Sequence, residues 1–273
     1  MNRLFILGAT AVLAALTAYP QDTQRVTVPF RNPSQPRKLV VETMSGSVTV
    51  RGYSGQEVTV ESTGGGLRGP GVKEPEPPAG MHRIGGNNSN LEITEDNNTV
   101  RISGGHFPFG HTDLTIQVPS QTSVSVKTFT GAGITIENIS GEIEANNMNG
   151  PVNITNASGS VVAHSMNGKV VVSLNSVTPD KPMSFSTMNG QIDVTLPASI
   201  KANVKLKTNH GDIFTDFDIK LDATAQPPQV DDNRKNGGRY RVRFDRGTNG
   251  TINGGGPEMQ FTTFNGNILI HKK

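Results

Sequence analysis

The sequence contains no cysteine and no tryptophan, and aromatic residues make up only 5% of its 273 residues. Without cysteine the chain can form no disulfide and can carry no lipid on an N-terminal cysteine, so stability has to come from backbone pairing and stacked aliphatic side chains. Glycine and proline are plentiful instead, with 31 and 17 residues. This composition is typical of the thin, regular cores of repeat proteins.

The chain also lacks an excess of either charge, since 25 Lys and Arg against 23 Asp and Glu give a formal net charge of +2. A nucleic-acid-binding protein needs a basic face to neutralise phosphates, so this class is disfavoured. The G-x-S-x-G nucleophile motif and the G-x-x-x-x-G-K phosphate loop are absent as well. We therefore expect no cofactor and assign no catalytic, cofactor-binding or metal residues.

Only one long apolar run is present, from Leu4 to Leu16, which is too short for an ordinary membrane span. Arg3 precedes it and the small residues Thr17-Ala18 follow it, as in a secretory signal peptide. We predict a signal peptide over 1–18 and export to the periplasm or the cell surface, with no membrane span after cleavage. An uncleaved anchor is the alternative.

A nine-residue repeat dominates the rest of the chain. Four units follow one another without a gap over 133–168: GITIENISG, EIEANNMNG, PVNITNASG and SVVAHSMNG. Five more matches to the same template lie at 38–46, 123–131, 182–190, 203–211 and 258–266. Internal repeats of this kind are the sequence signature of repeat architectures.

The repeat unit alternates like a strand with one buried face, because positions 2 and 4 are apolar and position 3 is mostly polar. Position 7 is also apolar, as in Ile139, Met148, Ala157 and Met166. It has the opposite parity, so we expect the chain to bend and turn this position to the core too. Asn-Gly or Ser-Gly then supplies a corner, since glycine accepts positive φ and asparagine tolerates it.

These features predict an all-β fold, a single-domain β-solenoid or β-roll with coils of about 18–22 residues, two repeat units making one coil. A β-sandwich or antiparallel meander is the alternative, because Asn-Gly is also a strong hairpin signal. An 18-residue coil places Glu137 beside Thr155, Glu142 beside Ser160 and Glu144 beside Val162. No acidic pair of the kind that glycosidases use forms at these positions.

The predicted organisation is a lead-in over 19–37, with a first strand at RVTVPF, followed by the β-solenoid over 38–273. Excursions rich in Gly and Pro interrupt it at 64–90 and 222–239, and loops this long are uncommon unless they are functional or mobile. The chain ends directly on a strand, which we expect to pair as the last coil.

The segments TINGGGPEMQFTTFNGNILIHK and DLTIQVPSQTSVSVKTFTG, together with the TMSG, TMNG and TFNG corners, resemble a bacterial putative-adhesin family of β-strand-repeat domains of unknown function. The resemblance covers about 38–270. It implies a β-solenoid located in the bacterial envelope, and it carries no known active site.

The sequence offers three further groups of candidate residues. His106, His111 and Asp113 are close in sequence and could form a metal site, although solvated loop histidines are favoured. The corner Asn and Ser residues are expected to bond to neighbouring corners or to backbone. A regular threonine column is expected on the solvent face of the strands, where threonine is common; its members are Thr43, Thr128, Thr187, Thr208 and Thr263.

The resulting hypothesis is a non-catalytic exported β-repeat scaffold, an adhesin-like or envelope interaction module. Its expected partner is an envelope protein or glycan, contacted through the flat faces and the two excursions. The alternative is a polysaccharide-acting enzyme on a β-solenoid, using excursion carboxylates such as Asp231 or Asp232; this alternative depends only on fold analogy.

Overall fold

The computed structural model describes residues 24–64, 91–104, 112–222, 229–232, 240–243 and 247–273. Within these residues the regular structure consists of β-strands, without a helix, so the all-β prediction is confirmed. No helix of this part is long and apolar enough to cross a membrane. The strands are β1 (Gln24–Pro29), β2 (Lys38–Tyr53), β3 (Glu57–Gly64), β4 (Glu92–Asp96), β5 (Thr99–Gly104), β6 (Thr112–Pro119), β7 (Ser123–Glu137), β8 (Ile143–Asn149), β9 (Val152–Gly159), β10 (Val161–Asn167), β11 (Val170–Val177), β12 (Met183–Asn189), β13 (Ile192–Leu196), β14 (Ala202–His210), β15 (Ile213–Thr215), β16 (Ile219–Leu221), β17 (Gln229–Asp232), β18 (Tyr240–Arg243), β19 (Thr248–Ile252), β20 (Glu258–Asn265) and β21 (Ile268–Lys272).

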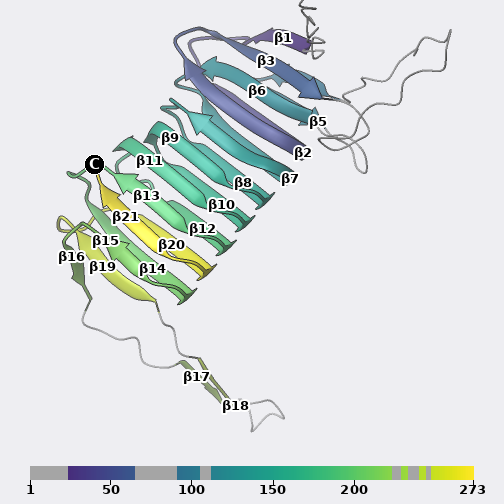
Figure 1. The fold of residues 1–273 in the computed structure, drawn as a ribbon. Helices are drawn as coiled ribbons and strands as arrows, with labels where there is room; N and C mark the ends of the chain where they lie inside the picture. The colour runs from purple at the N-terminus through teal and green to yellow at the C-terminus, as the bar shows by residue number, and fades with distance from the viewer. Residues whose placement is uncertain (1–23, 65–90, 105–111, 223–228, 233–239, 244–246) are drawn as a thin grey trace, which may run out of the picture.

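Nineteen of the strands form one mostly parallel sheet that is folded into two layers. The front layer contains β8, β10, β12, β20 and β14, and the back layer contains β9, β11, β13, β21 and β15 (Figure 1). The two long strands β2 and β7 turn the corner, so that each contributes its first half to the front layer and its second half to the back layer. Each pass through a front and a back strand is one coil.

The register between coils follows the spacing of the repeat. Ile143 pairs with Val161 and Val152 with Val170, which is a step of 18 residues. The next step is 22 residues, since Val162 pairs with Ser184 and Val170 with Ile192. The predicted neighbours of Glu137 and Glu144, namely Thr155 and Val162, are confirmed as pairs.

The C-terminal coil is not the last coil of the stack, and the prediction that it would be is wrong. β20 pairs with β12 on one side and with β14 on the other, and β21 pairs in the same way with β13 and β15. Figure 1 shows these two yellow strands between the green ones. The chain therefore completes the coil of β14 and β15 before its end returns to fill the place beside β12 and β13.

The N-terminal end of the stack has a matching arrangement. β2 pairs with β5 and β6 on one side and with β7 on the other, although β5 and β6 follow β2 in the sequence. The predicted first strand, RVTVPF, is confirmed as β1. At each end of the stack, the second coil from the end is therefore out of sequence order. It is formed by β2 at one end and by β20 and β21 at the other.

Antiparallel strands border the coils at both ends. β4 pairs with β5, and β1 pairs with β3, which pairs with β6. At the other end β19 lies between β14 and β16. β17 and β18 pair with each other in a separate two-stranded sheet, and of these two strands β17 lies within the predicted excursion over 222–239.

Positions 2 and 4 of the repeat fill the space between the layers, as predicted. Ile143, Ala145, Ile134 and Ile136 are all buried. The largest buried side chains include Phe185 on β12 and Phe261 on β20, whose ring centroids are 5.0 Å apart. Because β12 and β20 are neighbours, these two rings pack across the interface that the C-terminal coil makes.

Candidate functional site

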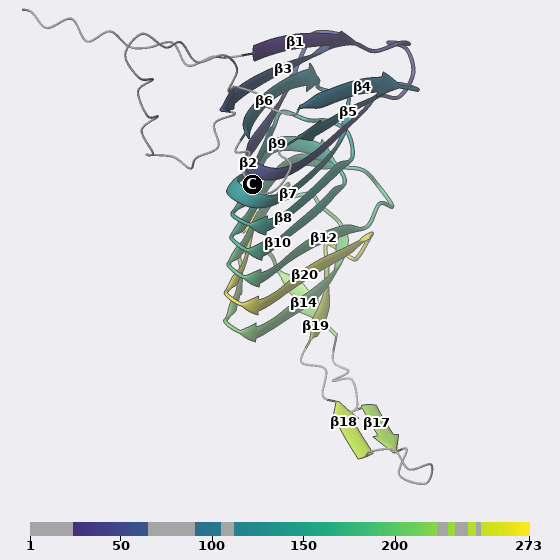
Figure 2. The same ribbon diagram turned by 90° about the vertical axis from the view of Figure 1, so that its right-hand side faces the viewer.

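A continuous row of apolar side chains points outward from the front layer. Each residue occupies position 7 of a repeat unit and is 36–49% exposed. We call the row the Met/Phe ribbon; its members, in the order of the stacked strands, are Met44, Phe129, Met148, Met166, Met188 and Phe264. Figure 2 shows the ends of the strands that carry it stacked one below another. Strands lie about 4.8 Å apart, so six neighbouring positions give a ribbon about 24 Å long.

The prediction that position 7 faces the core is right for the back layer and wrong for the front layer. Ile139 and Ala157 are fully buried in the back layer. There the preceding residues, Asn138 and Asn156, have φ values of 59° and 53° and turn the chain inward. The front strands contain no such residue and stay extended to position 8, so alternation places position 7 outside.

Beneath the ribbon, position 6 faces inward and carries a small polar residue. Four of these hydroxyls donate to the carbonyl of a corner glycine in a neighbouring coil: Ser165 to Gly150 at 2.9 Å, Thr187 to Gly168 at 2.9 Å, Thr263 to Gly190 at 3.1 Å and Thr208 to Gly266 at 3.0 Å. The expectation of a solvent-facing threonine column is therefore wrong, because the corner carbonyls need donors that threonine supplies from inside.

The corners themselves are tightly stacked. A Cβ on Gly168, Gly190 or Gly266 would overlap the carbonyl oxygen of the corner glycine in the adjoining coil. Close approach, more than positive φ, is thus what requires glycine at Gly168 and Gly190, since only Gly266 of these three has a φ in the left-handed region.

An asparagine ladder runs beside the Met/Phe ribbon and confirms the expected bonding between corners. The side-chain amide of Asn167 donates to Asn149 at 2.9 Å, Asn189 donates to Asn167 at 2.8 Å, and Asn265 donates to Asn189 at 2.7 Å. His210 occupies the next position, in register with Asn265. Its ring lies 5.2 Å from that of Phe264, edge to face. The ladder holds the strand ends in fixed register and so fixes the spacing of the ribbon.

The ribbon is hollowed at its centre. A pocket of about 240 Å³ opens between Phe129, Met148 and Met166, with Lys127 and His164 also in its wall. The Nδ1 atom of His164 lies 2.8 Å from the hydroxyl of Ser186 on the next strand. This histidine is on the same outward side as the methionines, two residues before Met166.

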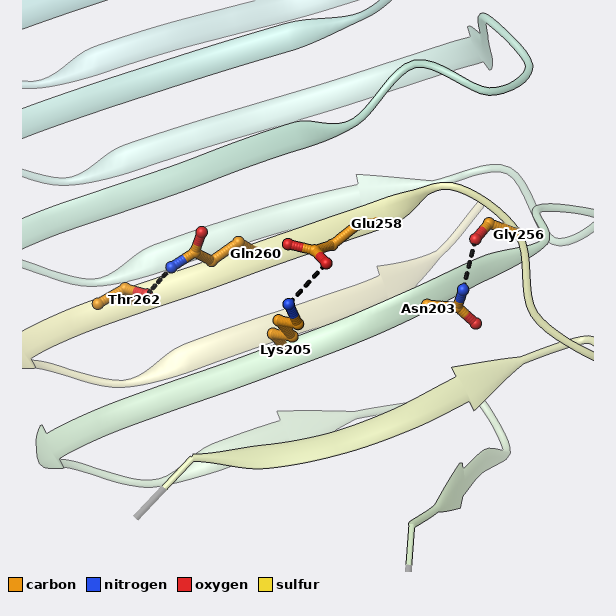
Figure 3. Close-up of polar contacts among 6 residues, drawn as sticks. All are labelled: Asn203, Lys205, Gly256, Glu258, Gln260 and Thr262. Carbon is orange, nitrogen blue, oxygen red and sulfur yellow. Dashed lines mark hydrogen bonds and ion pairs between the residues drawn. The ribbon is translucent and has the colours of Figure 1, made fainter. Parts of the chain in front are cut away.

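The outward surface turns polar toward the strand starts of β20 and β14. Figure 3 shows Lys205 paired with Glu258 at 2.6 Å, the Asn203 amide donating to the Gly256 carbonyl at 2.7 Å, and Gln260 beside Thr262 at 3.4 Å. The side chains of Lys205 and Glu258 are about half exposed, so their pairing stabilises the fold by only about 0–1 kcal/mol. On β20 and β14 the outward surface is thus polar at the strand starts, whereas the ribbon lies at the strand ends.

A second hollow, of about 500 Å³, lies at the strand starts of β7, β8 and β10, with Arg37, Lys38, Glu142 and Glu144 in its wall. Its carboxylates already have partners. Lys181 contacts Glu142 at 2.7 Å, and Glu144 accepts from Ser125 at 3.1 Å and from Asn146 at 2.9 Å. The register places no acidic residue opposite Glu137 or Glu144.

Two sequence candidates fall largely outside the described residues. His106 and His111 lie there, and so do the side chains of Asp231 and Asp232. Asp113 is described, and it accepts from the backbone N–H and the hydroxyl of Ser47 at 2.7 and 2.6 Å. In the described part of the chain no group of three or more His, Cys, Asp or Glu could hold a metal ion.

A known family model matches part of the chain. Residues 142–253 match the family model described as Toastrack DUF4097. No curated protein matches the chain.

Among the solved structures that are similar to the chain are two that cover more than nine-tenths of it. The first, a "putative cell adhesion protein" from Clostridium sporogenes, is 11% identical, with a TM-score of 0.46 over 92% of this chain and 99% of that chain. The second, a "putative adhesin" from Bacteroides fragilis, is 12% identical, with a TM-score of 0.37 over 93% of this chain and 98% of that chain. The family match supports the resemblance: residues 142–253 are similar to the Toastrack DUF4097 family, and the resemblance to a bacterial family of β-strand-repeat domains of unknown function is confirmed.

Proposed function

We propose that this protein is an exported, non-catalytic β-repeat scaffold that binds a protein of the bacterial envelope through the Met/Phe ribbon. In this proposal residues 1–18 are a signal peptide, and 38–273 form a single β-solenoid domain with coils of 18–22 residues. The ribbon is the observation that carries the proposal. The described residues offer no comparable support for the polysaccharide-acting enzyme.

Exposure of the ribbon is costly unless something covers it. Six large apolar side chains in register form one contiguous strip, and contiguous apolar strips on soluble proteins mark interaction sites. Methionine suits this role, since its unbranched, polarizable side chain adapts to irregular partners. These properties favour a protein partner over a glycan.

The asparagine ladder gives the apolar ribbon a polar edge. Each ladder bond uses one of the two N–H groups of an amide. The second N–H and a remaining lone pair on each oxygen are available along the same edge. A partner seated on the ribbon could therefore pair with a regularly spaced polar row beside it.

Changing Met148, Met166 and Met188 together to glutamine should abolish partner capture. Glutamine has nearly the same length but removes the apolar surface, and we expect capture of the partner from an envelope extract to fall at least about tenfold, equivalent to ~1.4 kcal/mol. The measurement is quantitative pull-down with the full chain, with unchanged thermal unfolding as the check on the fold.

Two controls separate the ribbon from the rest of the molecule. The same three residues changed to leucine should retain capture, because leucine preserves the apolar strip. Replacing 223–246 by a short turn should also retain it; β16 and β19 are adjacent there, with Leu221 opposite Gly250. Equal capture by the glutamine variant and the original chain would contradict the role of the ribbon, and capture of a glycan instead of a protein would contradict the partner class.

A further inference from the structure

We propose that Met148, Met166 and Met188, together with His164, form a binding site for a soft monovalent metal ion, Cu(I). This proposal goes beyond the partner-binding function and does not depend on it. The three methionines lie on consecutive strands, β8, β10 and β12, in the same position of the repeat. All three residues are partly exposed, at 36–49%.

The geometry of the strands brings the three thioethers within reach of one ion. Asn149, Asn167 and Asn189 pair in register, so the methionines that precede them are stacked on adjacent strands. Adjacent strands lie about 4.8 Å apart. A methionine side chain has three rotatable bonds and can lean by this distance, so the sulfurs of Met148 and Met188 can meet above Met166.

His164 supplies a fourth ligand whose orientation is already fixed. Ser186 contacts its Nδ1 at 2.8 Å, which holds the ring. In the tautomer that binds a metal through Nε2, Nδ1 carries the proton and donates to the Ser186 hydroxyl. A hydrogen bond from the second ring nitrogen is the usual support of a metal-binding histidine.

The surroundings select for a soft ion of low charge. Thioether and imidazole ligands favour Cu(I), whereas carboxylate and carbonyl oxygens suit magnesium, calcium and manganese. Lys127 lines the adjoining pocket of about 240 Å³ beside Met148 and Met166. Its positive charge disfavours a divalent ion more than a monovalent one. The nearest carboxylate in the repeat is that of Glu144, which accepts a hydrogen bond from the side-chain amide of Asn146 at 2.9 Å.

The test is competition for Cu(I) between the full chain and the colorimetric chelator bicinchoninate, under anaerobic reducing conditions. The original chain should withdraw one Cu(I) from the chelator. Met166→Leu should weaken binding at least about tenfold, and Ser186→Ala, which removes the support of His164, should weaken it by about 10- to 100-fold. Changing Met148, Met166 and Met188 all to leucine should abolish binding.

Met44→Leu is the matched control, because Met44 belongs to the same ribbon but Phe129 separates it from Met148. It should leave binding unchanged. As a second readout, Ag(I), an air-stable soft monovalent ion, should shift the methyl NMR signals of Met148, Met166 and Met188 and not that of Met44.

Failure of the original chain to compete with the chelator, or equal binding by the triple leucine variant, would overturn the proposal. These outcomes are distinguishable from a failure of the proposed function. The Ser186→Ala variant leaves every side chain of the ribbon in place, so it should weaken metal binding while retaining partner capture.

Discussion

Removing residues 257–273 is expected to unfold the protein, not to shorten it by one coil. The C-terminal strands β20 and β21 lie inside the stack, where each pairs on both edges. Their loss would separate β14 and β15 from β12 and β13 and expose four strand edges. It would also remove the buried side chains of Met259, Phe261, Ile268 and Ile270. Truncating one large core side chain costs about 2–5 kcal/mol, so losing four costs about 8–20 kcal/mol, as much as the 5–15 kcal/mol that stabilises a typical domain.

The measurement is urea unfolding followed by circular dichroism. The truncated chain should show no cooperative transition, whereas the full chain should show one. Replacement of 223–246 by a short turn removes a similar length of chain, and within the described residues β17 and β18 pair only with each other, so this variant should unfold like the full chain. A truncated protein that unfolds cooperatively, within about 1 kcal/mol of the full chain, would contradict the inserted position of β20 and β21.

Phe261→Ala should cost about 3–5 kcal/mol in the free energy of unfolding. The ring is fully buried and packs against Phe185 across the interface between β12 and β20. Its removal leaves a cavity at the contact that joins the C-terminal coil to its neighbour. Chemical denaturation of the single variant measures this loss.

Phe264→Ala is the matched control on the same strand, three residues further on. This ring points outward and is 44% exposed. Replacing it loses little beyond the contact with His210, so the expected cost is under about 1 kcal/mol. Similar losses in the two variants would mean that the assignment of inward and outward positions on β20 is wrong.

Much of the fold could be predicted from the repeat, because each pair of neighbouring parallel strands resembles the next pair. The nine-residue period places Ile143 beside Val161 and Glu144 beside Val162, and the structure shows these pairs. Positions 2 and 4 are buried for the same reason. Strand alternation and a constant period are local properties, so they can be derived without knowing which coil lies beside which.

The order of the coils could not be predicted because every unit presents the same backbone pattern to its neighbours. The repeat unit at 258–266 matches the unit at 182–190 as well as it matches the unit at 203–211. The structure places 258–266 between these two units. The size of the residue at position 4 is a side-chain signal for this order. Phe185 and Phe261 are both large, and the stack places them together, whereas Ala145 and Ala163 are paired elsewhere.

The expectation that every apolar residue at position 7 faces the core hides the candidate site. Strict alternation along EIEANNMNG predicts Met148 outside and Asn147 inside, which is the arrangement observed. Asn147 and its counterpart Thr187 are buried polar residues. The pattern is therefore inverted at the corner, with polar residues inside and apolar residues outside, and this inversion produces the Met/Phe ribbon.

Methionine oxidation by hydrogen peroxide, followed by peptide mass spectrometry of the native protein, tests that inversion most directly. Met44, Met148, Met166 and Met188 are exposed, whereas Met183 and Met259 are buried. The structure predicts that the four ribbon methionines become sulfoxides first, while the other two are protected until the protein unfolds. Met183 and Met188 lie on one strand and form an internal control. Oxidation of Met183 as fast as Met188, or protection of all six, would contradict an outward-facing ribbon.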